Sequence, residues 1–301
     1  MPPRSPSFAP QLWLLSMNLV WGISYSAVKY VLDRGMPPFA MMTARFWLAV
    51  AVLAPFVVHR RDALVSEAKR GIATGLSLLL GYVLQTLGMQ QTTASMAGFL
   101  SGLITLLVAL GGVLVFRERL HRATVLGLLL GVVGLVLMSW PDAGRDQAGK
   151  DSMLGVMLLI AASVSFACHI LMMSKWSRNG RETVYCWWQL VTVALGTAAF
   201  LPFQGGLAPV LEYALDPSIA GCIVYLAVFA LALAIVVQSR VQPRIKATQV
   251  AVIFATQPLF GALGGMGLMG DRLGTAQWIG GGLIVGGVLV AELLRETTNP
   301  A

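Results

Sequence analysis

Charged residues are scarce in this chain of 301 residues. They make up 11% of the sequence, whereas hydrophobic residues make up 57%, and the mean hydropathy is +0.76. Soluble globular domains carry about 25% charged residues. The sequence therefore has too few charges to cover a water-exposed surface of this size, and we expect most of its surface to face lipid.

Cysteine and histidine are also rare, with three of each. Cys168, Cys186 and Cys222 all lie inside apolar runs, without the spacing typical of a disulfide or a metal site. We interpret them as small buried hydrophobic residues. No metal, cofactor or catalytic residue is predicted.

Ten apolar runs are long enough to cross a bilayer as helices, which takes ~20 residues each. The sequence therefore predicts an all-α polytopic membrane protein with ten transmembrane helices. The stretch 204–217 is too polar to span and predicts a short surface helix or turn. The ten runs cover roughly residues 11–32, 38–58, 70–90, 93–116, 122–140, 152–175, 182–203, 218–240, 246–269 and 273–294.

The net charge of +8 comes from Lys and Arg in short clusters between the apolar runs. This pattern is typical of membrane orientation and not of a nucleic-acid surface, so no nucleic-acid partner is expected. Fifteen of these basic residues fall in one set of alternate loops, and the other set holds only Arg34, Arg145, Lys150 and Arg272. The positive-inside rule then predicts a multi-pass protein of the inner (plasma) membrane, with both termini in the cytoplasm.

A repeated word indicates that the chain contains two related halves. Ala109–Leu120 reads ALGGVLVFRERL and Ala262–Leu273 reads ALGGMGLMGDRL, so Glu118 and Asp271 lie 153 residues apart. Gly127/Gly280 and Gly134/Gly287 keep the same offset. Because each half has five spans, the second must be inverted relative to the first, which is typical of alternating-access carriers. We expect the Gly-rich spans four/five and nine/ten to form a packed core pair, which also offers a surface for a homodimer.

Further short words follow one another in a fixed order. The first half has Trp21-Gly22 with Lys29, Ala44-Arg45-Phe46 with Ala49, Gly88–Ala97, and Glu118-Arg119-Leu120; the second has Gln257-Pro258-Leu259 and Asp271-Arg272-Leu273. In these words the chain resembles the drug/metabolite transporter superfamily, in particular ten-helix exporters with two EamA-type halves. The resemblance implies a first repeat at 11–140 and a second, inverted repeat at 152–294. Within the superfamily the chain is most similar to exporters of amino acids, including the YddG-type exporters of aromatic amino acids.

Two positions depart from the family pattern. Asp271 replaces the usual Glu, and Gln257 stands where many members have Glu before the proline. The second change removes an intramembrane carboxylate, which puts a role of that position in proton or cation handling in doubt.

Polar residues at helical spacing mark a candidate cavity. In span one, Asn18, Trp21, Tyr25 and Lys29 fall on one face. Polar groups in a bilayer prefer a bundle interior or a wet cavity, and we interpret this stripe as cavity-lining. The alternative is that Asn18 bridges helices by hydrogen bonds and Trp21 is packing.

Other spans add candidates for the same cavity. Hydroxyl and amide groups suit the ends of a zwitterion, and aromatic faces suit an apolar side chain or an organic cation. The alternative for each Ser or Thr is a bond back to its own helix, and Pro258 should break the helix of span nine. The candidates are Tyr82 and Gln85 in span three, Ser101 and Thr105 in span four, and Gln249, Thr256 and Gln257 in span nine.

Three titratable groups leave alternatives open. His169 is the only histidine deep in a span, and it is either a substrate contact or proton relay, or a neutral core residue. One interpretation of Lys29 and Arg45 is a cationic pair that attracts a substrate carboxylate. The alternative is that Lys29 reaches the outer membrane interface and Arg45 braces loop carbonyls. For Arg45 we favour bracing.

The sequence predicts a membrane transporter that exports small metabolites, foremost amino acids including aromatic ones. No Asp or Glu lies deep in a predicted span, so we expect facilitative uniport and not ion coupling. The alternative substrates are organic cations or drugs, purines and sugar phosphates. A membrane-embedded enzyme would need a nucleophile–base or metal cluster, and a non-transporting scaffold would not need the inverted repeat. The expected partners are a small-molecule substrate, the lipid bilayer and a second copy of the chain.

Overall fold

The computed structural model describes residues 9–92, 94–117, 122–138, 152–177, 180–269 and 274–296, and all regular structure within these ranges is helical. Each predicted span is helical, although the helix of span three begins at Arg61 and therefore earlier than expected. The first seven spans are each a single helix: α1 (Ala9–Asp33), α2 (Pro38–Val57), α3 (Arg61–Gln90), α4 (Ala94–Phe116), α5 (Arg122–Met138), α6 (Met153–Trp176) and α7 (Glu182–Ala198).

The last three spans include two that are interrupted. Span eight consists of α9 (Pro217–Tyr225), the π-helix η2 (Leu226–Leu233) and α10 (Ala234–Val241), followed by the 3₁₀-helix η3 (Gln242–Arg244). Span nine is split into α11 (Ala247–Phe254) and α12 (Gln257–Met269), and span ten is α13 (Thr275–Glu296). The all-α architecture predicted from the sequence is confirmed.

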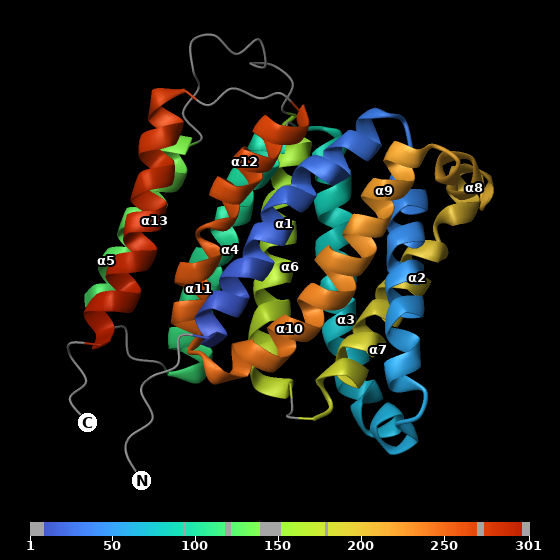
Figure 1. Ribbon diagram of the computed structural model, residues 1–301, viewed down its shortest axis with the longest axis horizontal. Coiled ribbons are helices and arrows are strands. Elements are labelled where there is room, and N and C mark those ends of the chain that lie inside the picture. The colour runs from blue at the N-terminus through green and yellow to red at the C-terminus, as the bar shows by residue number, and fades with distance from the viewer. Residues whose placement is uncertain are drawn as a thin grey trace.

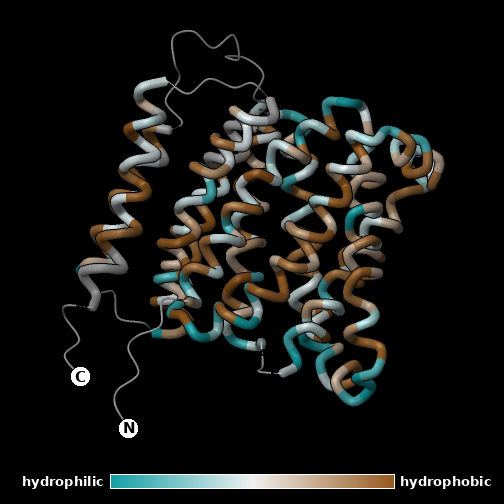
Figure 2. The backbone as a smooth tube through the Cα atoms, in the orientation of Figure 1, coloured by the Kyte–Doolittle hydropathy of each residue, from teal (hydrophilic) through white to brown (hydrophobic). Residues whose placement is uncertain are grey.

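The surface of the bundle is suited to lipid. Among the described residues, five stretches are each long and apolar enough to cross a membrane, and three shorter apolar helices accompany them. Large apolar side chains such as Leu80, Leu114 and Leu129 are more than half exposed, which is costly in water and favourable in a bilayer. Figure 2 shows hydrophilic residues gathered mainly at the two ends of the bundle. The chain is a multi-pass membrane protein.

Helices from the two halves interlock and do not form separate lobes. α1 packs against α12, α2 and α3 against α7, α4 against α6 and α11, and α5 against α13. Figure 1 shows α1 between α12 and the span-eight helices, so that the first helix lies inside the second half. The pocket described below is therefore built from both halves.

The break in span nine has a local cause. Pro258 is the second residue of α12 and has no N–H, so it cannot donate to the carbonyl of Phe254. The N–H groups of Ala255 and Thr256 instead close the last turn of α11, to the carbonyls of Ala251 (3.0 Å) and Ile253 (3.1 Å). The sequence-based expectation of a break at Pro258 is confirmed.

Glycines allow α5 and α13 to approach closely. A Cβ added at Gly134 would lie 2.5 Å from the carbonyl oxygen of Gly280, and one at Gly287 would lie 2.6 Å from that of Gly127. The repeated glycines thus face each other across one helix pair, as predicted. Figure 1 corrects their placement, because this pair lies at the edge of the bundle and not in its core. Glu118–Leu120 and Asp271–Leu273 of the repeated word lie outside the described residues.

The stretch 204–217 forms the predicted short surface helix, α8 (Ala208–Ala214), preceded by the 3₁₀-helix η1 (Leu201–Gln204). It leads into Asp216, which caps α9 by accepting hydrogen bonds from the N–H groups of Ser218 (2.8 Å) and Ile219 (3.3 Å). These backbone donors lower the pKa of the Asp216 carboxyl, and the guanidinium of Arg34, 3.6 Å away, acts in the same direction. The cap fixes the start of span eight.

Candidate functional site

A pocket lies inside the bundle where the interrupted spans meet α1, α3, α4 and α6. Its volume is about 90 Å³, well above the roughly 10–15 Å³ that a single water needs. Both halves of the chain contribute to its wall. The lining residues are Trp21, Ser24, Tyr25, Leu78, Tyr82, Gln85, Ile104, Phe166, His169, Ile170, Ala230, Leu231, Ile235, Gln238, Phe254 and Gln257.

One end of the pocket holds Tyr25, Gln85 and Gln257, which we call the Tyr25 cluster. The side-chain amide of Gln85 donates to the Tyr25 hydroxyl at 3.1 Å, and that of Gln257 reaches the same oxygen at 3.5 Å. Ser101 also reaches the Tyr25 hydroxyl from α4. Gln257 is here because the helix break starts α12 at this residue. Hydroxyl and amide groups can both donate and accept, so the cluster suits either end of a zwitterion.

The other end of the pocket holds His169 and Gln238. Nε2 of His169 lies 2.8 Å from Oε1 of Gln189, and both side chains are buried. Gln238 donates to Oε1 of Gln242 at 2.7 Å, and Gln242 in turn donates to the Ile170 carbonyl and the Ser174 hydroxyl, both at 2.6 Å. These bonds fix the orientation of both residues at this end.

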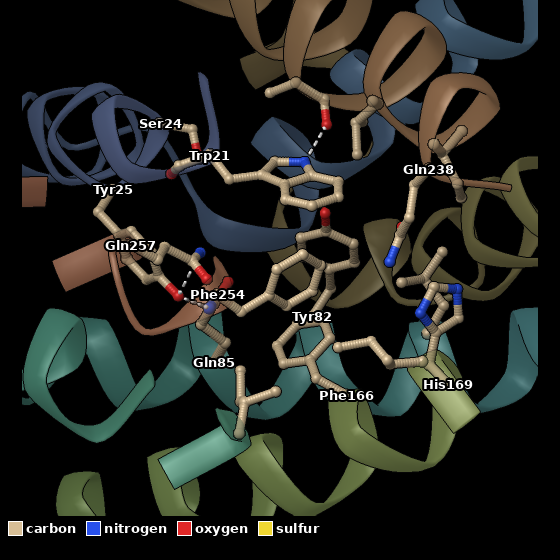
Figure 3. Close-up of a pocket in the computed structure, with 16 residues that line it drawn as sticks. Trp21, Ser24, Tyr25, Tyr82, Gln85, Phe166, His169, Gln238, Phe254 and Gln257 are labelled. Atoms are coloured by element: carbon tan, nitrogen blue, oxygen red, sulfur yellow. Dashed lines mark hydrogen bonds between the residues drawn. The ribbon is translucent and has the colours of Figure 1, made fainter. Parts of the chain in front are cut away.

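Aromatic rings separate the two polar ends, as Figure 3 shows. Trp21 meets Phe254 edge to face with ring centroids 5.7 Å apart, and Tyr82 meets Phe166 in the same way at 5.2 Å. Such arrangements are favoured by the quadrupoles of the rings. The middle of the pocket is therefore an apolar zone for a side chain, between two zones that can form hydrogen bonds.

Trp21 connects the pocket to the π-helix of span eight. Its Nε1–H donates to the carbonyl of Ala230 at 2.8 Å, drawn as a dashed line in Figure 3. The wider turn of a π-helix places its carbonyls differently from those of an α-helix, and such segments occur frequently at functional sites. Ala230 and Leu231 of this segment line the pocket.

Six of the eleven site residues predicted from the sequence line the pocket. They come from four spans that lie far apart in the sequence, and all six are labelled in Figure 3: Trp21, Tyr25, Tyr82, Gln85, His169 and Gln257.

The structure places Asn18 and Thr256 outside the pocket. The Asn18 amide donates to the Thr256 hydroxyl (2.6 Å) and to the Ile253 carbonyl (3.0 Å), so it ties α1 to the broken helix. Gln249 also lies elsewhere, because its side-chain oxygen accepts from the N–H of Lys246 at the start of α11. Asn18 therefore bridges two helices by hydrogen bonds, which was the alternative to its interpretation as a cavity-lining residue.

Ser101 and Thr105 are buried in α4 and do not line the pocket. Ser101 lies behind the pocket wall at Tyr25. The α4 face that holds these two residues therefore supports the Tyr25 cluster through Ser101 and does not form part of the pocket surface.

The two cations Lys29 and Arg45 do not form a pair. Nζ of Lys29 lies 2.9 Å from Asp33 one turn along α1, where it forms an ion pair. Arg45 is buried in α2, with its guanidinium 4.9 Å from the ring centroid of Tyr82. Neither cation lines the pocket.

Sequence reasoning missed Gln238, Phe166 and Phe254. Gln238 was detectable, because it is a lone amide in the otherwise apolar run of span eight. The two phenylalanines gave no such indication, since apolar rings in apolar helices look like packing. The π-helix was equally invisible, because its sequence LAVFALAL contains neither Gly nor Pro.

No metal centre is indicated in the part of the chain that the structure describes, where His, Cys, Asp and Glu form no group of three that could hold an ion. No carboxylate lines the pocket either. What the arrangement can do is enclose a small molecule that has polar ends and an apolar body.

The comparisons with the sequences of known proteins point to membrane transporters. The model of the EamA-like transporter family matches residues 9–140 and 153–293. An uncharacterized transporter of Archaeoglobus fulgidus is 28% identical and the match covers 94% of this chain and 85% of that protein. A "probable amino-acid metabolite efflux pump" of Escherichia coli is 27% identical with 92% of each chain covered, and its Salmonella typhimurium counterpart is 28% identical. One solved crystal structure shares the fold with a TM-score of 0.73 at 21% identity, covering 97% of this chain and 99% of that one.

Proposed function

Because the chain belongs to the EamA-like transporter family, we propose that it exports amino acids across the inner membrane by alternating access. The observation that carries the proposal is the pocket itself, in which two hydrogen-bonding ends flank an aromatic zone at two interrupted spans. Interrupted helices at the interface of inverted repeats are where carriers of this kind bind substrate. Two relatives described as probable amino-acid metabolite efflux pumps support the substrate class.

The volume of the pocket favours compact amino acids in the conformation described. A cavity of about 90 Å³ leaves less room for an aromatic ring than for a compact aliphatic side chain. Aromatic amino acids, which the resemblance to YddG-type exporters implies, would require Tyr82 or Phe166 to move aside. We propose that they are transported more slowly than leucine or valine.

Export of organic cations is the second candidate, since Trp and Tyr faces attract cations. The pocket lining favours amino acids over this candidate, because it contains no carboxylate to balance a cationic substrate. Sugar phosphates would need basic side chains to balance the phosphate charge, and the pocket wall contains no Lys or Arg.

We further propose that 11–140 and 152–294 are the two repeats that exchange roles during transport. The basic clusters in alternate loops support cytoplasmic termini. Gly282 and Gly286, with open space around them, are the proposed contact for a second copy.

The test is uptake of labelled leucine into proteoliposomes, competed by unlabelled amino acids, organic cations, purines and sugar phosphates. Aliphatic amino acids should compete best. If leucine is not taken up and a labelled organic cation is, the cation proposal replaces this one.

A matched pair of variants places the transported molecule in the pocket. Gln85→Leu removes an amide of the Tyr25 cluster and should raise the KM for leucine about tenfold, the range expected for one lost hydrogen bond to a charged group. Gln204→Leu removes an amide whose oxygen accepts from the N–H of Phe39 and which does not line the pocket, so it should leave the KM unchanged. Equal effects of the two variants would argue against this pocket.

A further inference from the structure

Arg45 is a buried cation whose charge is not neutralised by the described part of the protein. Its side chain belongs to α2 and is 3% exposed. Nε and Nη2 lack hydrogen-bond partners, and no carboxylate of a described residue pairs with the guanidinium. Its contacts are the faces of two rings, Tyr82 at 4.9 Å and Phe46 at 5.3 Å from Cζ to centroid.

This environment does not fit a bracing role. A bracing arginine donates its N–H groups to carbonyl oxygens, because a buried donor without a partner is costly. Cation–π contacts offset part of the cost of burying the charge, but they leave the in-plane N–H donors unused. Unneutralised charges inside membrane proteins mark substrate or ion pathways. The structure therefore points to an anionic partner that arrives during the transport cycle.

Tyr82 connects this cation to the pocket. Its ring lines the pocket, where Figure 3 shows it beside Phe166, and the same ring contacts the Arg45 guanidinium. Its neighbours there are Phe46 and Phe166, in edge-to-face contact at 5.1 and 5.2 Å. The described contacts of the Tyr82 ring are thus two other rings and the guanidinium itself, and movement of this ring would open the pocket towards Arg45.

We propose that Arg45 binds the carboxylate of the substrate once Tyr82 has moved aside, and so selects substrates that carry a carboxylate. The proposal rests on the proposed function, because it assigns the anionic group of an amino acid. The guanidinium is suited to the role, since its fork of N–H donors matches both oxygens of a carboxylate. Lys29 is not an alternative, because it already pairs with Asp33.

The test compares ligands that carry the carboxylate with one that lacks it. Binding of leucine, of leucinamide and of 4-methylpentanoate, which lacks the ammonium, is measured through the shift in Tm of the purified full-length protein in detergent. Arg45→Gln should weaken leucine and 4-methylpentanoate by at least about tenfold and change leucinamide much less. Arg45→Lys should recover part of the loss, and Lys29→Gln, the matched control, should behave like the wild type.

A second variant covers the case in which Arg45→Gln does not fold. Tyr82→Ala should give ligands direct access to Arg45 and raise the affinity for 4-methylpentanoate relative to leucinamide. The proposal is overturned if either variant affects the carboxylate ligands and the amide equally, or if no carboxylate stabilises the wild type. If 4-methylpentanoate stabilises the wild type and not Arg45→Gln while no amino acid is transported, Arg45 keeps its role and the proposed function fails.

Discussion

Single side chains in this protein often do two things at once. Trp21 forms part of the pocket wall with its ring and holds the π-helix with its Nε1–H, which donates to Ala230. Trp188 makes a comparable bond, to the carbonyl of Leu64 at 2.9 Å, but lies outside the pocket. Comparing variants at these two tryptophans therefore separates what such a hydrogen bond contributes to stability from what it contributes to substrate binding.

Trp21→Phe should keep the aromatic face and lose the hydrogen bond to Ala230. We expect about 1 kcal/mol of lost stability and a higher KM for leucine, because the pocket wall at the π-helix is no longer fixed. Trp188→Phe should lose a similar amount of stability and keep the KM. Thermal unfolding in detergent and uptake kinetics measure the two effects, and a normal KM for Trp21→Phe would contradict the role in the pocket wall.

At the scale of helices, the position of α1 depends on a close contact with α12. A Cβ added at Gly22 would lie 2.8 Å from the backbone nitrogen of Gly261 and 2.9 Å from the carbonyl oxygen of Gln257. Backbone atoms cannot give way as a flexible side chain can. The α1–α12 distance, and with it the separation of Tyr25 and Gln257, is therefore set by the absence of a side chain at Gly22.

Gly22→Ala should push α1 and α12 apart and destabilise the protein by about 1–3 kcal/mol, as overpacking typically does. Transport should fall further than stability, because the Tyr25 cluster spans the same two helices. Gly267→Ala is the control in α12, since nothing lies within 4 Å of the Cβ that it adds. Tm and uptake rate are measured for both, and equal behaviour of the two variants would refute the close contact.

The helices were predictable from the sequence, and the arrangement of the pocket only in part. Apolar runs of sufficient length fix where helices form, and Pro258 fixes the break, because its missing N–H is a local property. Trp21, Tyr25 and Gln85 were found because polar and aromatic groups in apolar spans must face protein or a cavity. Asn18 obeys the same rule but bonds to Ile253 and Thr256, and nothing local to the sequence distinguishes a helix–helix bond from a cavity. The π-helix and the contact between Arg45 and Tyr82 depend on tertiary packing.

For the whole molecule, the composition of the pocket bears on how transport is driven. Coupling to protons or sodium usually relies on a carboxylate within the membrane, and none lines the pocket. His169 is the one histidine of the lining, and its ring is held by Gln189. Transport should therefore follow the gradient of the substrate itself.

An imposed pH or sodium gradient should not drive accumulation of leucine in proteoliposomes beyond equilibrium. His169→Gln should leave this independence unchanged, because the amide can replace the hydrogen bond to Gln189 without a titrating group. Accumulation driven by a proton gradient in the wild type and abolished in His169→Gln would show that the histidine couples transport to protons.

The interlocking of the two halves has a consequence for biosynthesis. The bonds from Asn18 to Ile253 and from Trp21 to Ala230 join residues that lie 235 and 209 positions apart. A ribosome adds about 5–20 residues per second, so the first helix enters the bilayer roughly 10–50 s before its partners exist. During that interval the Asn18 amide and the Trp21 indole have no native partner. The nascent chain must therefore keep its first span accessible to later ones, and final assembly has to wait until span nine has been synthesised.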